Sequence, residues 1–179
     1  MKKNRMVIVA IFACITFFLP YSLKAQGDKD KILNDCKGVK TAFIKTDESI
    51  KNLFNNSYGY AIFPDIGKGA VVVGGAGGNG AVYEKGKAIG TAKMVQVSVG
   101  AQVGGQAYRE VIFFENKDAL DRFKDNKFEF SGQVSAVALK SGASANAKYR
   151  EGVAVFTQEK GGLMAEASIG GQKFTYKSL

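Results

Sequence analysis

The sequence predicts an α+β fold, in which an N-terminal amphipathic helix and one short helix pack on a glycine-rich antiparallel β-sheet or partial barrel. Apolar residues recur at helical spacing between residues 28 and 56. From residue 58 onward, short apolar runs alternate with glycine-containing turns. The chain has 22 glycines in 179 residues. Most gaps between the runs are shorter than the dozen or so residues that a parallel crossover requires, which favours antiparallel pairing.

A secretory signal peptide is predicted for residues 1–25, with cleavage before Gln26. The segment opens with three basic residues, Lys2, Lys3 and Arg5. An uncharged, mostly apolar run follows over residues 6–19 and ends at Pro20. A retained membrane anchor is the alternative, but the run is shorter than the ~20 residues of a spanning helix. We therefore expect export to the periplasm or the extracellular space.

The mature chain is predicted to form one domain, made of a helical segment (26–57) and a β-rich core (58–179). One apolar stripe follows the helical segment: Ile32, Cys36, Val39, Phe43, Ile50 and Phe54. Thr46 and Asp47 could cap a fresh start, so the segment is one helix or two. Cys36 is the only cysteine of the mature chain, and its place on the stripe predicts a buried, unreactive thiol.

The β-rich core is predicted to be a meander that curls or closes. The expected strands cover residues 60–63 (ending at Pro64), 70–73, 81–83, 88–99, 102–115, 128–139, 153–157, 163–169 and 173–176. Residues 84–87 are typical of a hairpin turn. Asn116 is expected to cap a brief helix that turns Ala119, Leu120 and Phe123 inward.

A glycine-rich stretch over residues 74–80 matches the letters G-x-G-x-x-G between Gly75 and Gly80. A dinucleotide site would also need a helix that starts there and an acidic residue about twenty positions later. The next segment instead predicts a strand and a turn, and residues 95–104 contain no Asp or Glu. We expect a glycine-rich hairpin loop and no cofactor.

Catalytic chemistry is strongly restricted by composition, because the chain contains no histidine. Serine–histidine and cysteine–histidine nucleophiles and histidine metal ligands are therefore excluded. The acidic residues of the core are scattered and predict solvated surface charge: Glu110, Glu115, Asp118, Asp121, Glu129, Glu151 and Glu166. Strand pairing could still bring two of them together, so an unfamiliar carboxylate enzyme remains an alternative. We expect no catalytic residue, no metal site and no small-molecule substrate.

Basic residues suggest an anionic partner. Removal of the four basic residues of the signal peptide lowers the formal net charge from +9 to +5. The candidates for binding anionic lipid lie in the first helix and in the hairpin at 85–93: Lys29, Lys31, Lys37, Lys40, Lys85, Lys87 and Lys93. Ordinary solvated lysine is the alternative. A nucleic-acid partner is not expected, since aromatic residues are not interleaved with the lysines and the chain is expected to be exported.

A series of motifs resembles the SYLF domain family, in its exported bacterial branch. They begin with Tyr58-Gly-Tyr-Ala-Ile-Phe-Pro64, Gly67-Lys-Gly69, Val73-Gly-Gly-Ala76, Ser98-Val-Gly-Ala-Gln102 and Gly104-Gly-Gln106. They continue with Glu110-Val-Ile-Phe-Phe114, Gly152-Val-Ala-Val-Phe156, Gly162-Leu-Met164, Ser168-Ile-Gly-Gly-Gln172 and Phe174. The resemblance implies a compact α+β domain without catalytic activity. Eukaryotic members bind phosphoinositides, largely through an N-terminal amphipathic helix, and are tied to actin regulation.

The function predicted from sequence is thus non-enzymatic binding to anionic phospholipid, a membrane surface or the cell envelope. A structural or protein-binding envelope module, with an envelope protein as partner, is the second hypothesis. The carboxylate enzyme is the third.

Overall fold

The computed structural model describes residues 26–67, 75–97, 107–126, 128, 130, 136–160 and 171–179. The predicted signal peptide and the predicted strands at 70–73 and 163–169 lie outside these residues. The chain divides into two compact units, Met1–Lys31 and Ile32–Leu179. The sheet belongs to the second unit, together with residues 32–46 of the first helix.

The described residues contain three helical segments and seven strands. The helices cover residues 26–46, Ile50–Asn56 (α2) and Lys117–Lys124 (α3). The strands are Gly59–Ile66 (β1), Gly75–Glu84 (β2), Lys87–Val97 (β3), Tyr108–Phe114 (β4), Val137–Ala138 (β5), Val153–Glu159 (β6) and Gln172–Ser178 (β7). The predicted α+β class is confirmed.

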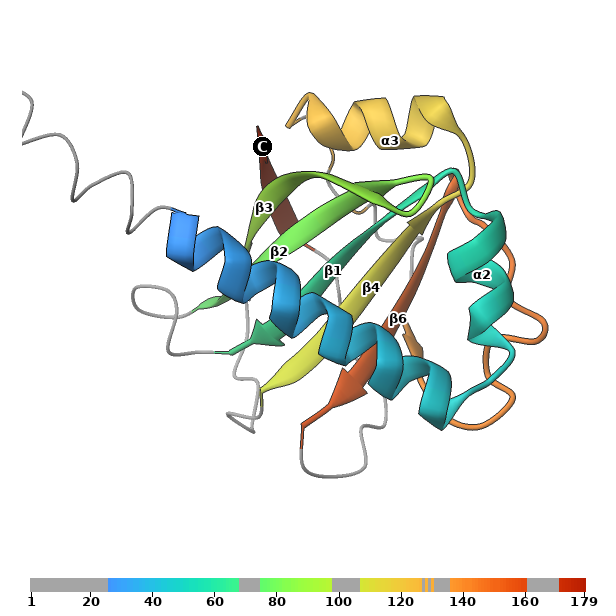
Figure 1. The fold of residues 1–179 in the computed structure, drawn as a ribbon. Coiled ribbons are helices and arrows are strands. Elements are labelled where there is room, and N and C mark those ends of the chain that lie inside the picture. Colours follow the sequence, from blue (N-terminus) through green and yellow to red (C-terminus); the bar gives the residue numbers. More distant parts are fainter. Residues whose placement is uncertain are drawn as a thin grey trace, which may run out of the picture. The chain divides into compact units, whose positions relative to one another are not determined.

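The strands form one open sheet in the order β5-β6-β4-β1-β2-β3-β7 (Figure 1). The described pairings are antiparallel except that of β5 with β6. Strands β1, β2 and β3 make the predicted meander. Strand β4 then pairs with the other side of β1, and β7 pairs with the far side of β3. The meander prediction is therefore wrong beyond β3, because the chain twice returns to an edge that was left free.

Both faces of the sheet are covered by helices, as Figure 1 shows. On one face, the helix face, residues of the predicted stripe are buried: Cys36, Val39, Phe43, Ile50 and Phe54. On the other, the α3 face, Ala119, Leu120 and Phe123 are fully buried. Successive residues of β1, such as Tyr60 and Ala61, belong to the two different clusters. Burial on both sides explains why the central strands are continuous apolar runs.

The buried thiol prediction is confirmed. Cys36 is fully buried, and its thiol donates to the carbonyl oxygen of Ile62 at 3.3 Å. Burial raises the pKa of Cys36 to about 12, because a thiolate there would lose its hydration. The side chain therefore packs as a small apolar group.

The sheet is curled on the α3 face. The side chain of Gln172 (β7) donates to Tyr108 at 3.2 Å and to Glu110 at 3.0 Å, both on β4. In the sheet, three strands lie between β7 and β4. Contact between such distant strands requires strong curvature, so the open sheet has the form of the partial barrel that the sequence suggested.

Of the two alternatives for the N-terminal helical segment, two helices is correct, since the first helix ends at residue 46 and α2 begins at Ile50. The N-cap of α2 is Ser49 rather than Thr46 or Asp47. The cap of α3 is also confirmed: the Asn116 side chain accepts from the backbone N–H of Ala119 at 3.0 Å. A side-chain oxygen at this position pairs one of the free N–H groups of the first helical turn.

The predicted glycine-rich hairpin loop is wrong, because residues 75–80 form the first part of strand β2. These glycines are required by close approach of the backbone of β1. A Cβ on Gly78 would collide with the carbonyl oxygen of Asp65. One on Gly80 would collide with the carbonyl oxygen of Ile62 and would lie 2.7 Å from a ring atom of Phe63. The glycines thus allow two strands to pack where side chains would not fit.

Two further strand boundaries differ from expectation. Strand β1 continues past Pro64 to Ile66, and its pairing with β4 shifts between Phe63 and Ile66. Proline is tolerated there because an irregular pairing leaves its missing N–H unused. Within the predicted strand 128–139, the described residues form a strand only at Val137–Ala138, while Phe128 and Phe130 pack into the core.

Candidate functional site

Two of the seven candidate lysines line one surface depression of about 460 Å³. We call it the lysine-lined depression, and its lining residues are Lys40, Phe54, Asn55, Asn56, Ser57, Tyr58, Lys85 and Gly86. Lys40 comes from the first helix and Lys85 from the turn between β2 and β3. Between them lies the end of α2, where the exposed amides of Asn55 and Asn56 provide further hydrogen-bond donors.

Lys40 is held by aromatic packing at the wall of the depression. Its ammonium group lies 4.8 Å from the ring centre of Phe54 and 5.2 Å from that of Tyr60. It also donates to the hydroxyl of Tyr60 at 3.4 Å. Half-burial lowers the pKa of Lys40, because the charged form loses part of its hydration. The rings offset some of this cost by cation–π attraction and fix the position of the charge.

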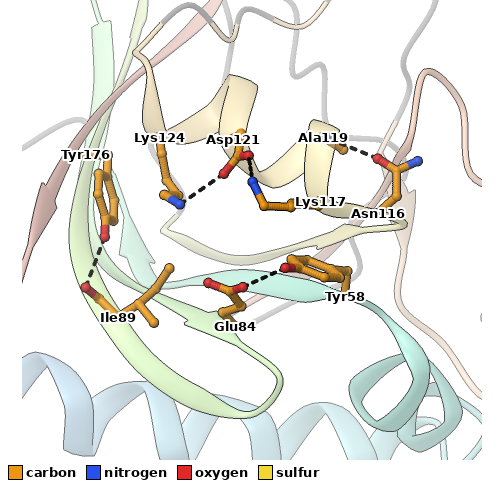
Figure 2. Close-up of polar contacts among 9 residues, drawn as sticks. All are labelled: Tyr58, Glu84, Ile89, Asn116, Lys117, Ala119, Asp121, Lys124 and Tyr176. Atoms are coloured by element: carbon orange, nitrogen blue, oxygen red, sulfur yellow. Dashed lines mark hydrogen bonds and ion pairs between the residues drawn. The ribbon is translucent and has the colours of Figure 1, made fainter.

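Lys85 is placed by a tight turn in which both Lys85 and Gly86 have positive φ, at 48° and 79°. Two such residues are typical of a two-residue hairpin whose twist matches its strands. The ammonium group of Lys85 lies 5.4 Å from the ring centre of Tyr58. The hydroxyl of Tyr58 donates to Glu84 at 2.7 Å (Figure 2), and this bond raises the pKa of Tyr58. Tyr58 thus orients both a cation and an anion at this turn.

A second group of charges lies on α3, across from Glu84 (Figure 2). Asp121 accepts from Lys117 and from Lys124, the latter at 3.0 Å. These bonds raise the pKa of both lysines and lower that of Asp121. The carboxylate of Glu84 also acts on both lysines and raises their pKa, so the two ammonium groups are balanced by two carboxylates.

The other candidate lysines do not join the depression. Lys29 and Lys31 belong to the unit Met1–Lys31, and Lys37 is an exposed residue of the first helix. Lys87 and Lys93 are both exposed on β3 and are about 20 Å apart along the strand.

A bulge turns Lys87 and Lys93 to opposite faces of the sheet. Val82 pairs with Gly90 and Tyr83 with Ala88, so Ile89 is an additional residue on β3. An additional residue reverses the alternation of side chains beyond it. The hairpin at 85–93 is therefore not one continuous basic face.

Part of this site has no signal in the sequence. Tyr58 and Glu84 are 26 residues apart, and they meet only because Gly59 pairs with Glu84 across β1 and β2. Asn55, Asn56 and Ser57 have the composition of a turn, which does not predict that two exposed amides border a depression. Lys117, Asp121 and Lys124 have the i,i+4 and i,i+3 spacings that signal ion pairs on a helix.

The prediction of solvated carboxylates is wrong for Glu110, which is fully buried on β4. Alternation places its side chain on the α3 face beside the core. Glu115, Asp118 and Glu151 are exposed, whereas Glu129 and Glu166 lie outside the described residues.

Across the part of the chain that the structure describes, no group of three or more His, Cys, Asp and Glu side chains could hold a metal ion. In the same residues, no helix is both long and apolar enough to cross a membrane.

Comparison with known proteins shows the following similarities. Residues 95–178 match the family model Ysc84, described as "Las17-binding protein actin regulator". The chain is also similar to "Beta cell expansion factor A" of Aeromonas veronii, with 34% identity over 126 residues. That match covers 70% of this chain and 48% of the Aeromonas protein, so the chain spans about half the length of this curated relative.

Proposed function

Residues 95–178 carry the Ysc84 domain, also called SYLF, and from this premise we propose that the protein binds anionic phospholipid headgroups through the lysine-lined depression. The SYLF resemblance is confirmed over these residues. Membership of this family suggests lipid- or actin-related binding, and the family is generally non-enzymatic. Of these possibilities, lipid is the ligand that the charges of the depression favour.

The observation that carries the proposal is the pairing of Lys40 and Lys85 on one depression, although they are distant in sequence. A phosphate group offers several acceptor oxygens and a negative charge, which match two ammonium groups and the Asn55 and Asn56 amides.

The proposed binding rests on charge rather than on insertion of apolar side chains. The apolar stripe of the first helix is used to cover the sheet, since Cys36, Val39 and Phe43 are at most 4% exposed. Among the described residues, the exposed large hydrophobic side chains are Val137 and Leu179. Attachment that depends on lysines weakens as salt screens the membrane surface.

We expect the double variant K40Q/K85Q to bind phosphatidylglycerol vesicles about thirtyfold more weakly than the wild type at low salt, since each of the two lysines near an anionic surface contributes about 1 kcal/mol. Co-sedimentation with vesicles at low and physiological salt measures this. The matched control is K173Q/K177Q, which removes the same charge from exposed positions on β7. Equal losses in both variants would show that only net charge matters, and equal binding to neutral vesicles would contradict the lysine mechanism.

A protein partner, such as an envelope protein, is the second candidate. The described surface offers no large apolar patch to which such a partner would bind. The main support for a protein partner is the description of the matching family, which names Las17 binding and actin regulation. Vesicle binding that is absent even at low salt would leave this candidate as the better one.

We further propose that the protein is exported and acts in the periplasm or outside the cell, on the basis of the charged and apolar segments of residues 1–25. The expected mature chain begins at Gln26. Intact-mass measurement of protein from the envelope and the medium tests this. Recovery of a chain that keeps Met1, or one with diacylglycerol on Cys14, would refute cleavage at this position.

A further inference from the structure

One carboxyl group on the α3 face is enclosed and incompletely paired. Glu110 is fully buried, and its Oε2 accepts from Nε2 of Gln172 at 3.0 Å. Its Oε1 has no hydrogen-bond partner in the described residues, and the same holds for Oε1 of Gln172 and Oγ1 of Thr157. The unpaired oxygens of the Gln172 amide and of an ionised Glu110 can only accept, whereas the Thr157 hydroxyl can also donate, so the cluster is rich in acceptors.

The elements around Glu110 bring it no positive charge within the described part of the chain. Its register neighbours are Phe63 on β1 and Thr157 on β6, and β7 contributes Gln172. The titratable groups on the same face are Tyr108, two residues earlier on β4, and Glu159, which is opposite Tyr108 on β6.

Burial governs the protonation of these groups. It raises the pKa of Glu110 to about 7, and the bond from Gln172 offsets only part of this effect. Burial also raises the pKa of Tyr108, which therefore stays neutral.

The position of this pair gives it a mechanical role. Gln172 is the first residue of β7, and it joins the edge strand β7 to β4 across the curled sheet. Two residues later, Phe174 packs against four aromatic rings at centroid distances of 5.1 to 6.2 Å: Phe63, Phe123, Phe128 and Phe130. Because Gln172 and Phe174 are on the same strand, a displacement of Gln172 also displaces Phe174 from this aromatic part of the core.

We propose that Glu110 and Gln172 form a proton-controlled clasp that holds β7 against β4 while Glu110 is neutral and releases it when Glu110 ionises. The protonated carboxyl adds an O–H donor to this oxygen-rich cluster, whereas the ionised carboxylate can only accept. On ionisation, its O–H proton passes to water, and the enclosed negative charge has no counter-ion among the described residues. Separation of β7 relieves that charge by admitting water, and it uncovers Phe174.

The direction of the pH dependence follows from the two protonation equilibria. We call the form with β7 held against β4 the closed form. In this form Glu110 keeps its proton up to about pH 7, whereas a solvated carboxyl loses it near its ordinary pKa of 4.5. The closed form is therefore fully favoured below about pH 4.5 and loses its advantage as the pH rises to about 7.

Hydrogen–deuterium exchange tests the clasp in the intact chain. We expect the protection factors of the β7 amides to fall at least about tenfold between about pH 5.5 and about pH 8, while those of β1 and β4 change little. In E110Q, which mimics the neutral acid, the protection of β7 should be the same at both pH values. The matched control E115Q changes an exposed carboxylate next to β4 and should behave as the wild type.

The clasp is overturned if β7 of the wild type keeps equal protection at both pH values, or if E110Q retains the wild-type pH dependence. Equal loss of protection in all strands would indicate global destabilisation and would also overturn it. If E110Q does not fold, a ¹³C NMR titration of the Glu110 carboxyl in the wild type decides. A midpoint near 7 supports the clasp, and one near 4.5 refutes it.

Discussion

Replacement of Gly80 by alanine is expected to lower the free energy of unfolding by about 3 kcal/mol, the upper part of the range for overpacked sites. The added methyl group would collide with the carbonyl oxygen of Ile62 and would lie 2.7 Å from a ring atom of Phe63. Both belong to β1, which is paired on both sides and fully buried here. The strands therefore have to separate to accept the new group. Urea denaturation measures the change.

Gly38 is the matched control for this substitution. It lies at an exposed position inside the first helix, and a Cβ there would meet nothing within 4 Å. Alanine at Gly38 should raise stability by about 1 kcal/mol, because glycine is a poor helix former. Opposite signs for the two variants would show that strand packing, rather than glycine content, decides the result. Equal stability of the Gly80→Ala variant and the wild type would refute the close packing of β1 and β2.

The second large effect is expected at Asp47, between the first helix and α2. Its carboxylate accepts from the backbone N–H and hydroxyl of Ser144, both at 2.7 Å, and from the N–H and hydroxyl of Ser49 at 3.1 and 2.5 Å. Asp47→Ala should cost about 3 kcal/mol, because it removes charge-assisted bonds and leaves the buried N–H of Ser144 unpaired. Asp65→Ala is the control and should cost under about 0.5 kcal/mol, because its ion pair with Lys160 is exposed.

Acid should remove the contribution of the Asp47 carboxylate to folding stability over a defined pH range. Burial alone would raise the pKa of Asp47, but the hydrogen bonds from Ser49 and Ser144 outweigh it and lower the pKa from 3.8 to about 2. The stabilisation is therefore fully present above about pH 3.8 and is lost as the pH falls through about 2. The wild type should lose more stability over this range than Asp47→Ala, in which the other carboxylates still titrate. Parallel curves for the two proteins would contradict this assignment.

The elements of the fold that depend on local patterns were predictable. The stripe from Cys36 to Phe54 has helical spacing, and it covers the sheet as expected. Asn116 was recognisable as a cap, because its side chain acts within three residues. The apolar runs that became β1, β4 and β6 were also correctly identified.

The errors arise where distant segments meet. Gly78 and Gly80 are typical of a loop, and only the approach of Asp65 and Ile62 shows that they belong to a strand. The burial of Glu110 depends on its register with Thr157 and on the curvature that brings in Gln172. No pattern within a short window contains that information.

The candidate site was predicted in part for the same reason. The lysines were recognisable in the sequence. The one additional residue at the Ile89 bulge, however, turns Lys87 and Lys93 to opposite faces of the sheet. The meeting of Lys40 and Lys85 depends on the packing of a helix against a hairpin, which sequence spacing does not specify. Their role in lipid binding stays a prediction.

The strand order has a consequence for how the chain reaches this structure. Strands β1 to β3 pair with their sequence neighbours, whereas β7, near the end of the chain, completes the far edge beside β3. The contact of Gln172 with Glu110 closes a loop of 62 residues, and contacts of high sequence separation slow folding. During synthesis, β3 therefore remains an unpaired edge until β7 has been made. Lys87 and Lys93 on that strand oppose edge-to-edge association in the meantime, because charged side chains discourage the addition of another strand.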